Sequence, residues 1–198
     1  MEKVETTFMF LKRCVLLAGD SGLGKSSSAI CVLENYGYHV YEFNASDIRT
    51  QSEIHESLFN LIHIKQIKHD LPPAIIIDEI DGIAGPGLAE IMKYINPDRG
   101  KGNRRKEDRE KRVPIPPMIC ICNNVTERKL IDFRKDCLEL TFTKASDQNL
   151  TTLLNRICKA EKIKLDAEAK ELVIEYSQQD YRRLVNYLQS LDKVILKK

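Results

Sequence analysis

The sequence has no long apolar run and no large excess of charge of either sign. Its longest apolar stretch, around residues 14–18, is far too short to cross a bilayer, which needs about 20 apolar residues. Lysine and arginine number 31 and aspartate and glutamate 29, so the formal net charge is only +2. We therefore expect no membrane partner, and charge alone does not predict binding to nucleic acid.

Metal-binding and secretory patterns are also missing. None of the 4 histidines is spaced with the 6 cysteines in a zinc-binding pattern. We expect the side chains of Cys120 and Cys122 to point to opposite faces of a predicted strand and not to bind one metal together. The chain carries no secretory signal pattern. These features predict reduced thiols in an intracellular protein.

Short apolar runs alternate with longer amphipathic segments. The predicted strands are 14–18, 38–43, 74–77, 118–122 and 137–142. Nearly continuous apolar strands separated by helices predict an α/β fold, in which helices cover both faces of a parallel sheet. After residue 143 the sequence predicts three amphipathic helices, over 146–160, 166–178 and 179–192. We therefore predict an α/β domain over residues 1–143 and a helical domain over residues 144–198.

One segment, residues 98–112, interrupts this alternation. It has no apolar residue and carries 8 basic and 4 acidic side chains. Such a composition predicts a solvated surface insertion. Attraction to nucleic-acid phosphates and an inert surface role both remain open for it.

The stretch GDSGLGKS, at residues 19–26, has the spacing of a phosphate-binding loop. It follows a predicted strand and opens a predicted helix, so backbone N–H groups and the helix N-terminus would face one point. Lys25 would reach the β- and γ-phosphates of a nucleotide, and the hydroxyl of Ser26 would bind Mg²⁺. The loop therefore predicts a nucleotide site.

Polar residues that end later strands can complete such a site. Asp78 and Glu79 end the run IIIDEID; Asp78 is suited to the Mg²⁺ shell and Glu79 to orienting an attacking water. Asn123 ends the run MICICNN, and the carboxyl ends of parallel strands gather at one edge of a sheet. Arg182 or Arg183, near the start of the last helix, could reach the nucleotide from the helical domain.

Four elements follow one another along the chain: the phosphate-binding loop, the strand that ends in two acids, the strand that ends in asparagine and the arginine of the last helix. In this order they resemble the AAA+ ATPases. EFNASDIRT, at 42–50, resembles the E-x-N-A-S-D-x-R box of clamp-loader subunits. IDEIDG at 77–82 and PPMICICNN at 116–124 are most similar to the large subunit of replication factor C. Its counterpart in the alternative, chromosome-cohesion loader is also similar, since it too has a basic insertion before this strand. The resemblance spans residues 14–192 and implies an AAA+ P-loop αβα sandwich with a five-stranded parallel sheet and a small helical lid.

The resemblance also implies roles for individual residues. Asp78 becomes the Mg²⁺ acid together with Ser26, Glu79 the catalytic acid, Asn123 the first sensor and Arg182 the second. The bound ligands would be ATP and Mg²⁺. The cofactor-binding set is one continuous run and one acid: Gly19, Asp20, Ser21, Gly22, Leu23, Gly24, Lys25, Ser26, Ser27 and Asp78.

Two further positions bear on partners. Arg49 matches the box arginine that touches the DNA backbone in clamp loaders. Small loader subunits carry serine-arginine-cysteine before the fifth strand and thereby offer an arginine to a neighbour's ATP. This sequence reads Lys135, Asp136, Cys137 there, as expected of a large subunit, and Arg134 lies one residue earlier.

The implied function is the ATPase module of a clamp-loader large subunit in DNA replication. Its implied partners are small loader subunits in a hetero-oligomer of five, a sliding clamp and primer–template DNA, and its implied location is the nucleus. We expect weak ATP hydrolysis by the isolated chain. The alternatives are a structural subunit of a clamp-loader-like complex that binds nucleotide with little hydrolysis, or another AAA+ ATPase of DNA replication. A P-loop kinase would lack the box and the lid arginine, and a helicase would need a second motor domain.

The segment 54–67 predicts a further surface. Four residues of this segment share the helical face expected in the core: Ile54, Leu58, Leu61 and Ile62. Phe59, Ile64 and Ile67 lie off that face. We hypothesise that these three form an exposed apolar patch that contacts the clamp. A second buried face is the other interpretation.

Overall fold

The computed structural model describes residues 12–45, 50–63, 71–96 and 116–195. Its sheet has five parallel strands in the order β2-β3-β4-β1-β5. The strands are β1 (Cys14–Ala18), β2 (His39–Asn44), β3 (Pro73–Asp78), β4 (Met118–Cys122) and β5 (Leu138–Thr141). The predicted α/β fold with a five-stranded parallel sheet is confirmed.

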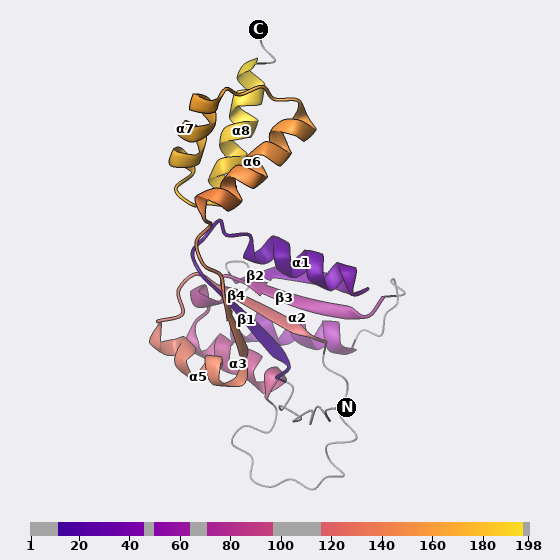
Figure 1. Ribbon diagram of the computed structural model, residues 1–198. Helices are drawn as coiled ribbons and strands as arrows, with labels where there is room; N and C mark the ends of the chain where they lie inside the picture. Colours follow the sequence, from indigo (N-terminus) through magenta and orange to yellow (C-terminus); the bar gives the residue numbers. More distant parts are fainter. Residues whose placement is uncertain (1–11, 46–49, 64–70, 97–115, 196–198) are drawn as a thin grey trace, which may run out of the picture.

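The helices are divided unevenly between the two faces of the sheet. Only the β1–β2 connection runs along the sheet in the opposite direction to the later ones. Because the crossovers are right-handed, the helix of the β1–β2 connection lies on one face of the sheet and the helices of the later connections lie on the other, as Figure 1 shows. The first is α1 (Lys25–Asn35), and the others are α2 (Gln51–His63), α3 (Gly85–Ile95) and α5 (Ile131–Asp136).

Each face of the sheet has its own apolar core. On the α1 side, Ala29 and Leu33 pack against Ile76 and Ile121. On the other side a larger cluster includes Phe133, which is fully buried. It also contains Ile54 and Leu58 of α2, as the helical spacing predicted.

The expectation about Cys120 and Cys122 was wrong. Both side chains lie in the core beneath α2, α3 and α5, because side chains two residues apart along a strand share a face. The Sγ atom of Cys14 in β1 lies 3.6 Å from that of Cys120. The cysteines are free thiols, and the described part of the chain contains no group of three side chains suited to hold a metal.

The chain continues beyond β5 into three helices that pack on one another, at the upper end of Figure 1. They are α6 (Asp147–Glu161), α7 (Ala167–Ser177) and α8 (Tyr181–Ile195). Their shared core contains Leu150, Leu154 and Leu184. The predicted domain limit at residue 144 stays a prediction; the last strand ends at Thr141 and α6 begins at Asp147.

The parallel register sets the place of the candidate site. Ala18 of β1 is the register partner of Cys122 of β4, and Asp78 of β3 is that of Asn44 of β2. The residues that follow these strands therefore meet at one edge of the sheet. The described residues include no helix long and apolar enough to cross a membrane.

A buried carboxylate joins α2 to α3. Glu90 of α3 is only 4% exposed. It accepts hydrogen bonds from Gln51 Nε2 at 3.0 Å and Lys93 Nζ at 2.6 Å, and its Oε1 lies 2.8 Å from His55 Nδ1. Burial by itself raises the pKa of Glu90, but these three partners outweigh it and lower the pKa to about 2.

The low pKa of Glu90 predicts a loss of stability in acid. The pKa of Glu90 is about 2 in the folded protein and ordinarily 4.5. The contribution of the ionised side chain to the free energy of unfolding is therefore complete above about pH 5. It is lost as the pH falls toward 2, and amounts to at most about 3 kcal/mol. Urea unfolding from pH 6 to 2.5 should show a shallower decline for Glu90→Gln than for the unaltered protein. Glu161→Gln, an exposed control, should follow the unaltered protein; equal declines for all three would contradict the assignment.

Candidate nucleotide-binding site

The loop between β1 and α1 is shaped by glycines. Gly22 and Gly24 have φ of 75° and 84°, a left-handed conformation that favours glycine. Gly24 is the N-cap of α1, so the helix begins at Lys25 with its N-terminus beside the loop. Backbone N–H groups of the loop and of the first helical turn therefore surround one small space.

Lys25 ties this loop to a second strand. Its Nζ donates to the main-chain oxygens of Gly19 and Asp20 at 2.8 Å each and to Asn123 Oδ1 at 3.0 Å. The residue is only 5% exposed. Burial lowers the pKa of Lys25, and the nearby carboxylate of Asp78 opposes the shift. The ammonium group thus links the β1 loop to the end of β4.

Ser26 and Asp78 meet directly across the site. Ser26 Oγ donates to Asp78 Oδ2 at 2.6 Å, which joins the start of α1 to the end of β3. The other carboxylate oxygen of Asp78 accepts from the backbone N–H of Glu79 at 2.8 Å. Two oxygen groups of the kind that bind Mg²⁺ in proteins are therefore adjacent here.

Glu79 has an unusual backbone. Its φ of 55° and ψ of 40° place a residue other than glycine in the left-handed region. A short 3₁₀ turn follows directly, η1 (Ile80–Gly82), in which Ile80 is fully buried and the Gly82 N–H bonds to the Glu79 carbonyl at 2.7 Å. Non-glycine residues held in this region cost about 1–3 kcal/mol and cluster at functional sites.

The lid helix α8 touches the glycine loop. The backbone N–H of Tyr181 donates to the Gly22 carbonyl at 3.1 Å. Asp180 accepts the N–H of Arg183 at 3.0 Å and so caps α8. Its carboxylate fills the space beside Gly22, where an added β-carbon would lie 1.9 Å from Asp180 Oδ1. This contact brings Arg182 to the loop.

These groups line a single cavity of about 100 Å³. Its lining combines the loop and helix start with the three strand-end residues and the lid arginine: Ser21, Gly22, Gly24, Lys25, Ser26, Ser27, Asp78, Glu79, Asn123 and Arg182. The other three predicted loop residues lie around it. Gly19 and Asp20 hold Lys25 through their carbonyls, and Leu23 is buried beneath.

A family model described as "ATPase family associated with various cellular activities (AAA)" matches residues 15–129. The chain belongs to this AAA family of ATPases. The match covers the sheet from β1 to β4 and therefore the glycine loop, Asp78, Glu79 and Asn123. Arg182, on the lid, lies outside the matched residues.

The relatives of this AAA chain confirm the resemblance that the sequence suggested. Chromosome transmission fidelity protein 18 of Saccharomyces cerevisiae is 33% identical over 91% of this chain and 26% of its own length. Replication factor C subunit 1 of the same yeast is 28% identical over 90% of this chain and 21% of its own length. The replication factor C large subunit of Staphylothermus marinus is 28% identical over 91% of this chain and 40% of its own length. The chain thus spans less than half the length of these relatives.

A solved structure of Thermotoga maritima RuvB, a Holliday junction branch migration motor, has a similar fold. The TM-score is 0.62 and the identity 16%, over 87% of this chain and 51% of that chain. At this identity the likeness shows the AAA fold alone.

Of three further features named from the sequence, only Arg134 lies in the described part of the chain. Arg49 and the insertion 98–112 lie outside the described residues. Arg134 is held within the chain, where its Nε and Nη2 donate to the carboxylate of Glu139 at 2.6 and 3.1 Å. Its Nη1 also donates to the Val125 carbonyl at 3.4 Å.

Two acids that contact residues of the candidate nucleotide site were not predicted from the sequence. Asp180 caps α8 against Gly22, and Asp81 accepts from the backbone N–H groups that follow β4. A signal for each was present. Asp180 stands where a helix N-cap is expected, and Asp81 is the last acid of IDEID. The sequence does not show that these acids contact other segments.

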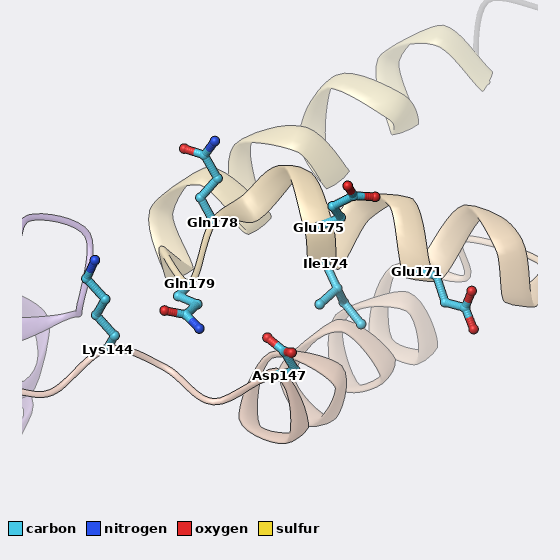
Figure 2. Close-up of a pocket in the computed structure, with 7 residues that line it drawn as sticks. All are labelled: Lys144, Asp147, Glu171, Ile174, Glu175, Gln178 and Gln179. Carbon is cyan, nitrogen blue, oxygen red and sulfur yellow. The ribbon is translucent and has the colours of Figure 1, made fainter.

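A larger hollow, of about 680 Å³, lies on the lid and not at the sheet edge. Figure 2 shows it between the segment around Lys144 and helix α7. Its lining includes the carboxylates of Asp147, Glu171 and Glu175, which would repel a phosphate chain. The smaller cavity, with Lys25 and Arg182, is therefore the better nucleotide site.

The contact between Gly22 and Asp180 predicts an unequal effect of two alanine substitutions. Gly22 and Gly37 have nearly the same φ, 75° and 77°, but only Gly22 has atoms of the described chain within 4 Å of an added β-carbon. Gly37→Ala should lower the free energy of unfolding by about 1 kcal/mol through backbone strain. Gly22→Ala should lower it by at least about 1 kcal/mol more, because of the collision with Asp180.

Urea denaturation followed by circular dichroism measures both effects. Adding Asp180→Ala to Gly22→Ala should recover part of the loss, since the collision is then removed. Equal losses for Gly22→Ala and Gly37→Ala would show that the lid does not press on the loop.

Proposed function

We propose that this chain binds ATP with its phosphate groups and Mg²⁺ at the 100 Å³ cavity, and hydrolyses the ATP. The observation that carries the proposal is the convergence of Lys25, Asp78, Glu79, Asn123 and Arg182 on that cavity from four segments of the chain. Membership of the AAA family of ATPases supports it.

The residues present fit both ligands. The N-terminus of α1 and the ammonium group of Lys25 supply positive charge for a triphosphate. Lys25 now has three oxygen partners, and phosphate oxygens can replace them. The Ser26 hydroxyl and the Asp78 carboxylate, whose oxygens lie 2.6 Å apart, are oxygen groups of the kind that would hold Mg²⁺. Mg²⁺ would neutralise charge on the β- and γ-phosphates when bound.

Each remaining side chain has a role in hydrolysis under this proposal. Glu79 orients the attacking water and accepts its proton. Asn123 lies between Lys25 and the end of β4, where its amide can hold the same water or the γ-phosphate. Arg182 reaches in from α8 and stabilises the charge that develops on the γ-phosphoryl group.

The larger role that we propose is the ATPase module of a clamp-loader large subunit. Similarity to replication factor C subunit 1 and to chromosome transmission fidelity protein 18 supports it, together with the box at 42–50. The proposed partners are small loader subunits in a five-membered hetero-oligomer, a sliding clamp and primer–template DNA in the nucleus. ATP would favour a closed state that holds the clamp, and hydrolysis would release it.

Two surface features bear on this role. Arg134 is paired with Glu139 within the chain, and we expect it to be a weak substitute for the arginine that small loader subunits offer to a neighbour's ATP. We expect this chain's own site to need an arginine from a neighbouring subunit, so that the isolated chain hydrolyses ATP slowly.

Phe59 of α2 is 46% exposed and stacks on His55. A buried face therefore does not account for this aromatic residue. Its contact with the clamp remains a proposal, and Ile64 and Ile67 lie outside the described residues.

Two substitutions test the ATPase proposal. Lys25→Ala should weaken ATP binding at least about tenfold, since the principal positive side chain in the cavity is lost. Glu79→Gln should bind ATP normally and lose at least about a hundredfold in single-turnover hydrolysis. Fluorescent ATP titration and phosphate release measure these effects, with the exposed Lys159→Ala as the control.

The outcomes separate the candidates. Unchanged ATP affinity in Lys25→Ala would refute the nucleotide site. Normal binding by the unaltered chain, with no difference in hydrolysis between it and Glu79→Gln, would instead indicate the structural subunit that binds nucleotide without useful turnover.

A further inference from the structure

Asp81 joins the ends of two strands. It lies in the 3₁₀ turn Ile80–Gly82, two residues after Glu79. Its Oδ2 accepts hydrogen bonds from the backbone N–H groups of Asn123 and Asn124, both at 3.3 Å. Its main-chain oxygen accepts from Lys129 Nζ. One acid thus connects the turn after β3 to the residues that follow β4.

The two turns joined by Asp81 carry the groups proposed to act on the attacking water. Glu79 stands in the left-handed region directly before η1. Asn123 directs its Oδ1 to Lys25 while its backbone N–H bonds to Asp81. A shift of the Asp81 carboxylate would therefore move Asn123 relative to both Glu79 and Lys25.

The position of Asp81 also lowers the stability of the fold. Its Oδ1 is buried and has no hydrogen-bond partner among the described residues. A buried acceptor without a partner costs about 1–3 kcal/mol. Burial raises the pKa of the Cys122 thiol at the end of β4, and the nearby carboxylate of Asp81 raises it further.

We propose that Asp81 is a positioning residue that holds Asn123 in place opposite Glu79. This inference rests on the proposed ATPase function. Asp81 does not touch the reacting atoms; it fixes the backbone from which Asn123 reaches the cavity. Its effect on hydrolysis passes through Asn123, whereas an acid needed only for folding would act independently of that side chain.

The first experiment needs no nucleotide. In Asp81→Ala, amide hydrogen exchange at Asn123 and Asn124, measured by NMR, should accelerate about tenfold or more because both N–H groups lose their acceptor. Asp81→Asn keeps one oxygen acceptor and should show a smaller acceleration. Asn124→Ala is the matched control, since it removes the 2.9 Å bond to the Thr126 N–H from the same turn but leaves the Asp81 contact with Asn123.

The second experiment measures hydrolysis. Asp81→Ala should slow single-turnover hydrolysis about tenfold or more and change ATP affinity by less than about threefold, with Asp81→Asn between it and the unaltered chain. Asn123→Ala should also be slow. The double variant should be no slower than Asn123→Ala by more than about twofold, because Asp81 acts through the Asn123 side chain and has nothing left to position once that side chain is removed.

Three results would overturn the inference: unchanged exchange at Asn123, unchanged hydrolysis in Asp81→Ala, or losses that multiply fully in the double variant. If Asp81→Ala does not fold, Asp81→Asn decides by the same measurements, with unchanged exchange and hydrolysis counting against the inference. Lys25→Ala distinguishes the two proposals. Unchanged ATP binding there would refute the ATPase function, whereas normal Lys25 dependence with an inert Asp81 would refute only the positioning role.

Discussion

The candidate site depends on one buried ammonium group. Lys25 Nζ is held by Gly19, Asp20 and Asn123, and so connects the loop after β1 with the end of β4. A buried charge is tolerated only where hydrogen-bonding partners surround it. The loop must therefore curl so that its carbonyls meet Lys25, and the strand end must present an amide oxygen. A triphosphate would compete for the same ammonium group.

Around Lys25, short links tie four segments together. Ser26 bonds to Asp78, Asp81 bonds to the residues after β4, and Gly22 contacts the start of α8. Because each link joins a different pair of segments, movement of one strand end or of the lid is passed to the others. The arrangement suits a nucleotide that couples chemistry to the position of the lid.

Much of the fold follows from sequence pattern. Apolar strands separated by amphipathic helices indicate a covered parallel sheet, and a parallel sheet brings its strand ends to one edge. Hence the polar residues that end β3 and β4 could be assigned to one site together with the glycine loop. The faces of Cys120 and Cys122 were misassigned by an error of strand periodicity, since residues two apart share a face.

The sequence by itself determined the element order, the glycine loop and the identity of the strand-end acids, because these depend on local composition and spacing. Only the tertiary structure decided that Arg134 is occupied by Glu139, that Asp180 packs on Gly22 and that Asp81 holds the turn after β4. Each of these is a contact between segments far apart in the chain, or between neighbouring elements whose relative direction no local pattern specifies. Their partners are chosen by the packing of the sheet and the lid.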